Sequence, residues 1–81
     1  MIKKFINEQN KLSKYIEKKI DLPSSSLSPN KKLSLIEEWD SLAHLSLIML
    51  IEKELKKEID VKKLVKCKTS DDLFKLIKQL V

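Results

Sequence analysis

The chain contains no glycine and only two prolines, Pro23 and Pro29, among its 81 residues. Glycine supplies the positive φ angles that two-residue β-hairpins require, so tight hairpins are disfavoured. Leucine, isoleucine, lysine and glutamate dominate the composition, and these residue types suit helices. No segment shows convincing strand alternation. A chain this short has room for one simple core, and we predict a single all-α domain over residues 1–81.

Apolar spacing predicts a first amphipathic helix at roughly residues 2–20, where apolar side chains recur at steps of three and four. Gln9 and Asn10 weaken the middle of this stretch, so the helix can begin later. Pro23 disfavours helix at the residue before it, and the element therefore ends near Asp21.

A long loop is predicted over residues 21–40, which are rich in serine, proline and asparagine. Loops of this length are usually functional or disordered. Several apolar residues argue against disorder and are expected to anchor the loop on the helices. These residues are Leu27, Leu33, Leu35, Ile36 and Trp39.

The rest of the chain predicts two more main helices and one short helix. The second helix is expected at about residues 41–57, about one helical turn within residues 59–65, and a last helix from about Ser70. Thr69 and Asp72 form a variant of the capping box that starts such a helix. The expected fold is a small four-helix bundle with a long loop between its first two helices.

The formal net charge of +5 is spread unevenly. Residues 1–20 and residues 61–81 hold six lysines each, whereas residues 33–51 contain no lysine. Glu37, Glu38 and Asp40 lie within that lysine-free window. The ends of the sequence therefore favour acidic partners or anionic surfaces, and its centre favours basic partners.

Cys67 is the single cysteine, which rules out an internal disulfide and a cysteine-cluster metal site. No metal site is expected. No segment reaches the roughly 18–20 apolar residues needed to span a bilayer, and the N-terminal residues soon turn polar. We therefore expect a monomeric cytoplasmic protein.

His44 lies one helical turn after Ser41, but no third group that could orient it as a base is apparent, so we expect a surface histidine and no enzymatic activity.

The run Asp40-Ser41-Leu42 opens the predicted second helix. Considered alone, Ser41 is an ordinary helix cap, since serine and aspartate are preferred there. The run also resembles the motif of the acyl carrier protein family. The similarity continues from Leu45 through the apolar and acidic residues of the second helix, and it covers roughly residues 2–78. Motif, helix order, loop and length all agree with a specialised stand-alone member of that family.

The resemblance implies a carrier with the acyl-carrier type of bundle. In that family the serine, here Ser41, holds 4′-phosphopantetheine through a phosphodiester, and the neighbouring acidic residue, here Asp40, is thought to help bind metal during modification. The terminal thiol of the arm carries an acyl or aminoacyl group as a thioester, in fatty-acid or secondary-metabolite biosynthesis. A phosphopantetheinyl transferase loads the arm from coenzyme A, and a ligase and acyl-accepting enzymes are the further partners.

Two groups of residues on the second helix and its approach are candidates for partner binding. Leu42, Leu45 and Met49 share one helix face, which either contacts partner enzymes or is simply core. A second group is acidic and either pairs with basic residues of partners or is ordinary solvated charge. This group consists of Glu37, Glu38, Asp40 and Glu52.

Two alternatives stay open on the sequence. The lysine-rich ends are typical of a small basic helical module that binds nucleic acid or an anionic surface, although the chain has no arginine and no evident row of base-stacking aromatics. The second alternative is a carrier-like domain that is no longer modified and retains only its protein contacts. The family usually has glycine two residues before the serine, where this chain has Trp39, which favours a dedicated carrier over a general one.

Overall fold

Every regular element of the computed structural model, which describes residues 1–81, is a helix. In chain order the elements are the 3-10 turn η1 (Lys3–Phe5), α1 (Gln9–Lys19), the 3-10 turn η2 (Leu33–Leu35), α2 (Ser41–Leu55), α3 (Val61–Lys66) and α4 (Ser70–Lys78). An isolated bridge between Lys32 and Thr69 is the one β-type pairing. The predicted all-α bundle, with three main helices and one short helix, is confirmed.

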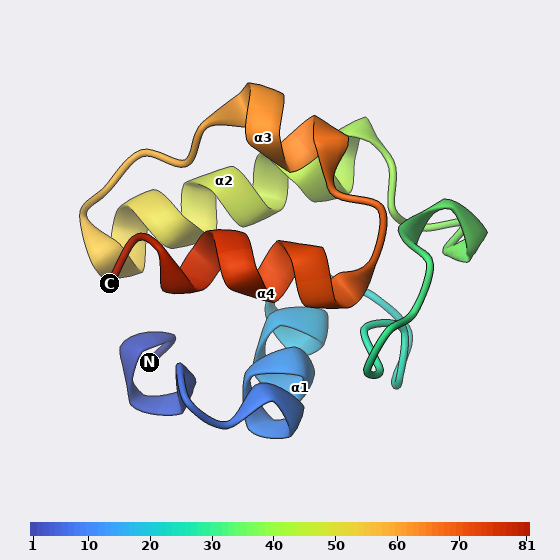
Figure 1. Ribbon diagram of the computed structural model, residues 1–81, viewed down its shortest axis with the longest axis horizontal. Coiled ribbons are helices and arrows are strands. Elements are labelled where there is room, and N and C mark those ends of the chain that lie inside the picture. The colour runs from blue at the N-terminus through green and yellow to red at the C-terminus, as the bar shows by residue number, and fades with distance from the viewer.

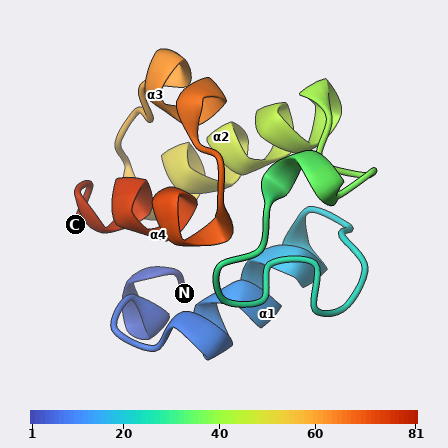
Figure 2. The same ribbon diagram turned by 45° about the vertical axis from the view of Figure 1, so that its right-hand side comes forward.

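The helices are arranged around α4. In Figures 1 and 2, α4 lies between α1 and the N-terminal segment on one side and α2 with α3 on the other. The loop of residues 20–40 passes from the end of α1 to the start of α2 along the right-hand edge of Figure 1. The start of α2 therefore lies at the same edge as the loop, away from both chain ends.

The first α-helix begins at Gln9, the later start that the weak stretch at Gln9 and Asn10 allowed, and residues 3–5 form a separate 3-10 turn because the chain breaks between η1 and α1. Glu8 has the non-helical angles φ −125° and ψ 82° at the N-cap of α1. A continuous helix would place Ile2 about 15 Å along its axis from Leu12. The break returns Ile2 to the core, where it is fully buried. Its backbone amide donates to the Glu54 carboxylate over 2.7 Å.

Glu54, near the end of α2, clamps the N-terminal segment to the bundle. Its Oε1 lies 2.8 Å from the Met1 amine, and its Oε2 accepts a short hydrogen bond from the Tyr15 hydroxyl. Burial acts to raise the pKa of Glu54, but the hydrogen bonds from Met1, Tyr15 and the Ile2 amide outweigh it and leave that pKa below its ordinary value. Burial and the bond to Glu54 raise the pKa of Tyr15 to about 12.

The core is made of 17 buried apolar residues drawn from all four α-helices, the N-terminal segment and the loops. The most completely buried helical members are Leu12, Ile16, Leu47, Ile51, Leu64, Leu73 and Ile77. Three of the expected loop anchors, Leu27, Leu33 and Ile36, are buried with them, and Trp39 packs against the core half-buried. Leu35 is exposed, so its expected anchoring is wrong; η2 turns its side chain away from the core.

Glu17 of α1 fastens the first part of the long loop. Its buried carboxylate accepts hydrogen bonds from the backbone amides of Ser25 over 3.1 Å and Leu27 over 2.8 Å. The Ser13 hydroxyl donates to the Leu27 carbonyl over 3.0 Å. These bonds satisfy loop backbone groups that would otherwise be buried without partners.

The start of α4 fastens the middle of the same loop. The buried Ser70 hydroxyl donates to the Ser28 carbonyl over 2.7 Å and accepts from the Lys31 amide over 3.1 Å. The carboxylate of Asp71 accepts from the Asn30 amide over 3.0 Å. Thr69 and Asp72 form the predicted capping box of α4. The loop is thus held in its first part by α1 and in its middle by α4, which restricts where it can place the start of α2.

Helix α2 ends two residues earlier than expected, at Leu55. Lys56 follows in the left-handed conformation with φ 58°, and its amide donates to the Glu52 carbonyl over 3.1 Å. Glycine is the residue that usually adopts the left-handed backbone conformation. This chain has no glycine, so other residues adopt it, each at a cost of about 1–2 kcal/mol. Asp21, Ser25 and Asn30 are the further cases.

Candidate functional site

Ser41 is the first residue of α2 and is exposed. None of the side-chain hydrogen bonds in the structure involves its hydroxyl. Since α2 is 15 residues long, the aligned peptide dipoles give its N-terminal end a partial positive charge. The hydroxyl therefore lies free at the positive end of the longest helix.

Asp40 is the N-cap of α2, so the interpretation of Ser41 as the cap is wrong. The backbone of Asp40 is extended, with φ −116° and ψ −169°, and its Oδ1 accepts from the Ala43 amide over 3.0 Å. The Asp40 carbonyl also accepts from the His44 amide over 3.0 Å. The amides of Ser41 and Leu42 remain without an intrahelical partner, as expected for the first turn of a helix.

Trp39 and His44 pack together behind this turn. The two rings meet edge to face with centroids 4.7 Å apart, and the Trp39 amide donates to the Ile36 carbonyl over 3.0 Å. The expectation of a surface histidine is wrong, because His44 is half-buried and its Nε2 is enclosed without a hydrogen-bond partner. The aromatic pair ties the start of α2 to the end of the loop.

A cleft of about 300 Å³ lies between the end of α1 and the start of α2, and Ser41 does not line it. Its lining residues are Lys19, Ile20, Asp21, Glu38, Asp40, Leu42, Ala43 and Ser46. Three carboxylates against one lysine make this cleft negative. Apolar atoms of Ile20, Leu42 and Ala43 contribute to its walls, so the cleft is mixed in character.

The candidate apolar face of α2, defined as Leu42, Leu45 and Met49, is not part of the core. These side chains are 71%, 52% and 60% exposed, respectively. On the same helix Leu47 and Ile51 are fully buried. The core interpretation of this face is therefore wrong, and α2 presents an uncovered apolar stripe that begins next to Ser41.

The acidic candidates form no ion pairs within the protein. Glu37, Glu38, Asp40 and Glu52 are exposed. The only two ion pairs in the structure join the Met1 amine to Glu54 and Lys11 to Glu8. The carboxylates near Ser41 are thus free to meet basic groups of another molecule.

Sequence reasoning missed the exposure of two valines on α3. Val61 and Val65 are 52% and 63% exposed, although both continue the apolar periodicity of a helix. A six-residue helix can bury only one line of side chains, here Leu64, and this shortness was the available signal.

Cys67 is half-buried between α3 and α4, and its Sγ donates to the Lys63 carbonyl over 3.4 Å. Burial and the neighbouring Asp72 raise the pKa of this thiol. A raised pKa leaves the thiol protonated and weakly nucleophilic.

No three His, Cys, Asp or Glu side chains are placed to hold a metal ion. None of the helices has the length and apolar character to cross a membrane. No protein-family description, curated protein or solved structure matches the chain.

Proposed function

We propose that the protein is a carrier of acyl or aminoacyl groups, with 4′-phosphopantetheine attached to Ser41. One observation carries the proposal: the Ser41 hydroxyl is exposed and unbonded, while Asp40 does the capping that a structural serine would do. A serine at this position is dispensable for the fold and accessible to a modifying enzyme.

The start of α2 suits a covalently attached phosphate. The amides of Ser41 and Leu42 have no intrahelical partner, and helix N-termini favour negative charge. The negative carboxylate of Asp40 would repel a phosphate attached nearby. The hydrogen bond that this carboxylate accepts from the Ala43 amide offsets part of that repulsion. The residues on either side of Ser41, Asp40 and Leu42, line the cleft between α1 and α2.

Attachment is a phosphoryl transfer from coenzyme A. The Ser41 oxygen forms a bond to the phosphorus that bears pantetheine, and the pyrophosphate bond of coenzyme A breaks. The nucleotide half leaves, and the hydroxyl proton passes to a base of the transferase. The thiol of the attached group supplies the thioester chemistry.

The apolar face of α2 and the acidic residues around it support a role in docking. A partner that covers Leu42, Leu45 and Met49 would remove exposed apolar surface from water. Basic groups of the partner would meet Glu37, Glu38 and Glu52. Both contacts would place the partner beside Ser41, as required of the transferase, the loading ligase and the acyl-accepting enzymes.

Mass spectrometry of the intact protein tests the proposal. Incubation with coenzyme A, Mg²⁺ and a phosphopantetheinyl transferase of broad specificity is expected to add one arm to the wild type and none to Ser41→Ala. Ser34→Ala, which removes another exposed serine, is the matched control and is expected to gain one arm. Protein purified from its source is expected to carry the arm and, in part, its cargo.

Two results would overturn the carrier function. One is unmodified protein both from the source and after treatment with several transferases. The other is modification of Ser41→Ala to the same extent as the wild type, which would place the arm elsewhere.

A further inference from the structure

The outer side of α1 carries a row of three lysines. Each helical residue turns the chain by about 100°, so Lys11, Lys14 and Lys18 lie within about 60° of one another around the helix axis. All three are exposed. The buried residues of α1 occupy the opposite side of the helix, and they are Leu12, Ser13, Ile16 and Glu17. The lysine stripe, defined as Lys11, Lys14 and Lys18, therefore points away from the bundle.

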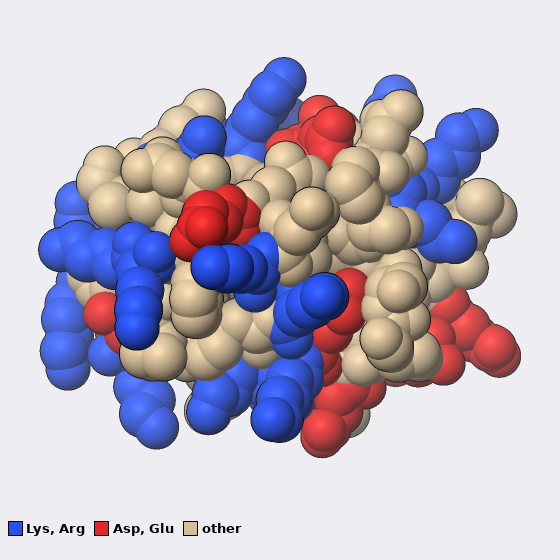
Figure 3. Space-filling view, turned by 90° about the horizontal axis from the view of Figure 1, so that it is seen from below, with Lys and Arg blue, Asp and Glu red and all other residues tan.

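The N-terminal segment brings two more lysines next to α1. Lys3 and Lys4 of η1 are exposed, and the segment packs on α1 through the rings of Phe5 and Tyr15, whose centroids are 5.8 Å apart. In Figures 1 and 2 this segment and α1 form the lowest part of the molecule. Figure 3 views the molecule from below and shows lysines over much of that side. The positive charge thus extends over an area that spans two elements.

Most of this charge is unpaired within the protein. Residues 1–20 hold six lysines and two acids, Glu8 and Glu17. Glu17 is buried, and its carboxylate is bonded to two amides of the long loop. Glu8 pairs with Lys11 over 3.3 Å, and the other five lysines form no ion pair. An anionic partner would therefore meet ammonium groups that are not already held by carboxylates.

Single-stranded nucleic acid finds no stacking platform on this molecule. Its bases stack on free aromatic rings, and every aromatic ring of this chain is engaged in the fold. The ring of Tyr15 packs against Phe5 and lies 5.6 Å from the ammonium group of Lys19. Trp39 packs at the start of α2, and Phe74 is buried. The chain also lacks arginine, the usual reader of base edges.

The lysines are spread in two directions. Along α1 the lysine stripe extends over roughly 10 Å, since each helical residue rises about 1.5 Å, and across α1 the charge continues onto the N-terminal segment. A nucleic-acid duplex presents its phosphates on a curved surface, which an area of lysines would meet only along a narrow strip. The headgroups of an anionic bilayer present a plane of negative charge that attracts basic residues over their whole area. The arrangement of the lysines therefore favours a bilayer over a duplex.

We propose that the lysine stripe of α1, together with the lysines of the N-terminal segment, binds the surface of an anionic phospholipid bilayer. Headgroup phosphates would meet Lys11, Lys14 and Lys18, and α1 would lie along the surface without entering it. The contact is electrostatic, so it weakens as salt is added. It does not depend on the modification of Ser41, so Ser41→Ala is expected to bind as the wild type does.

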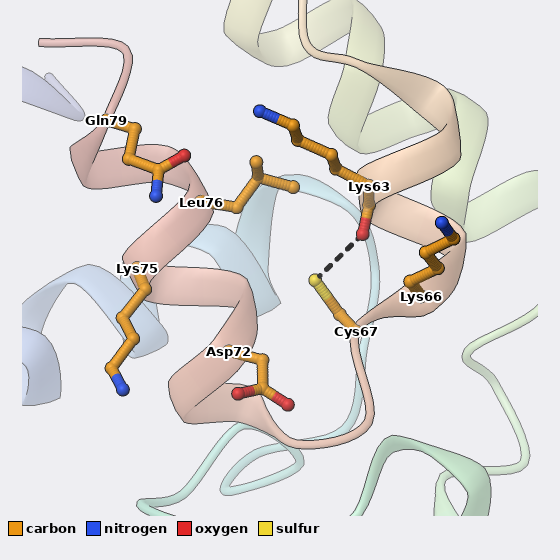
Figure 4. A pocket seen from close by; sticks show the side chains of 7 residues that line it. All are labelled: Lys63, Lys66, Cys67, Asp72, Lys75, Leu76 and Gln79. Atoms are coloured by element: carbon orange, nitrogen blue, oxygen red, sulfur yellow. Dashed lines mark hydrogen bonds between the residues drawn. The ribbon is translucent and has the colours of Figure 1, made fainter.

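Lysines on α3 are arranged differently and provide a control. Lys63 and Lys66 line a shallow groove of about 280 Å³ against α4, and Figure 4 shows their ammonium groups pointing in different directions. Asp72 lines the same groove. In Figures 1 and 2, α4 lies between α3 and α1. The α3 lysines therefore face another side of the molecule than the lysine stripe does.

Vesicle co-sedimentation of the whole chain tests the proposal. Wild-type protein is expected to bind vesicles of phosphatidylcholine with phosphatidylglycerol at low salt, to leave them as salt is added, and not to bind vesicles of phosphatidylcholine alone. Each lysine near an anionic surface contributes about fivefold to partitioning. The triple variant Lys11→Gln, Lys14→Gln, Lys18→Gln is therefore expected to lose binding on the order of 100-fold.

Two matched variants separate the position of the charge from its amount. The first is Lys62→Gln, Lys63→Gln, Lys66→Gln, which removes the same charge from exposed positions on α3 and is expected to retain most of the binding. The second is Lys11→Arg, Lys14→Arg, Lys18→Arg, which keeps the charge of the lysine stripe and is expected to bind like the wild type. Circular dichroism checks that each variant is folded, as expected for changes of exposed side chains.

Nuclear magnetic resonance locates the contact on the wild-type protein. When the anionic vesicles contain a spin-labelled lipid, the amide signals of α1 and the N-terminal segment are expected to broaden more than those of α3. This measurement reports which side of the molecule faces the lipid, and it does not depend on the total charge.

Three results would overturn the proposal. The first is failure of the wild type to bind the anionic vesicles at low salt. The second is an equal loss of binding in the two glutamine triples, or broadening centred on α3, because either would show that the lysine stripe has no special part in the contact. The third is tighter binding of the wild type to a single-stranded or duplex oligonucleotide than to the vesicles at equal phosphate concentration, which would assign the lysine stripe to nucleic acid.

Discussion

At the start of α2, neighbouring residues have different tasks. The Asp40 carboxylate caps the helix through the Ala43 amide, and the exposed Ser41 hydroxyl makes no internal bond. Asp40→Ala is therefore expected to lower the free energy of unfolding by about 1 kcal/mol, whereas Ser41→Ala changes it by less than about 0.5 kcal/mol. Urea unfolding followed by circular dichroism measures both. Asp40→Asn, which keeps a capping oxygen, is the control; a Ser41→Ala loss as large as that of Asp40→Ala would contradict this division.

Glu17 is the buried charged residue on which the long loop depends. Glu17→Ala leaves the Ser25 and Leu27 amides without acceptors and is expected to destabilise the fold by roughly 2–3 kcal/mol. Glu17→Gln keeps one acceptor oxygen and is expected to cost less. Urea unfolding of both variants, with the exposed Glu8→Ala as control, checks the order. Equal stability of Glu17→Ala and the wild type would show that these bonds contribute nothing.

Single residues could be assigned from sequence only where their partners are local. Thr69 and Asp72 are three positions apart, and their capping box was predicted correctly. Asp40 and Ser41 are both good caps by type, so only the backbone geometry of Asp40 decides between them. Glu17 gave no signal, because charged residues are usually exposed and its partners lie in an irregular loop.

At the scale of elements, α2 has two apolar faces with different consequences. Leu47→Ala removes a fully buried side chain and is expected to cost about 2–5 kcal/mol. Leu45→Ala, on the exposed face, is expected to change stability by less than about 0.5 kcal/mol. The same variant is expected to slow modification of Ser41 about fivefold, the effect of losing an interface contact worth about 1 kcal/mol.

Urea unfolding and a timed transferase assay measure the two effects separately. Val65→Ala, an exposed apolar change on α3, is the control for the assay. Unchanged modification of Leu45→Ala, with its stability intact, would remove this side chain from the docking face.

Helical periodicity predicted where most of the helices lie. It predicted neither where the chain breaks between helices nor which helix faces are buried. Residues 2–20 carry one apolar stripe, yet the chain turns between η1 and α1 to bring Ile2 into the core. On α2, periodicity predicted two apolar faces, and only tertiary packing decided which of them is covered. The short helix α3 was placed well, whereas the exposure of Val61 and Val65 follows from its limited contact with the bundle.

Across the whole molecule, charge is distributed unevenly. The exposed carboxylates of Glu37, Glu38 and Asp40 lie just before and at the start of α2, whereas lysines cover much of the side of the molecule seen in Figure 3. An approaching basic partner is therefore attracted to the start of α2 rather than to that side.

Acid stability tests how the N-terminal segment is joined to this bundle. The pKa of Glu54 is lowered in the folded state, so its stabilising contribution is present above the unfolded value of about 4.3 and is lost as the pH falls through the lower folded value. The free energy of unfolding of the wild type is expected to decrease once the pH drops below about 4. Asp71 and Asp72 contribute to this decrease, because hydrogen bonds lower their pKa values as well.

Glu54→Gln isolates the contribution of the clamp. The variant is expected to be less stable than the wild type at pH 7, and the difference is expected to shrink as the pH falls, because the wild type loses the same charge by protonation. Urea unfolding at a series of pH values between neutrality and strong acid measures this convergence. Glu52→Gln, an exposed change on the same helix, is expected to follow the wild-type curve. A constant gap between Glu54→Gln and the wild type would mean that the carboxylate acts by its shape alone and that its charge does not hold the N-terminal segment.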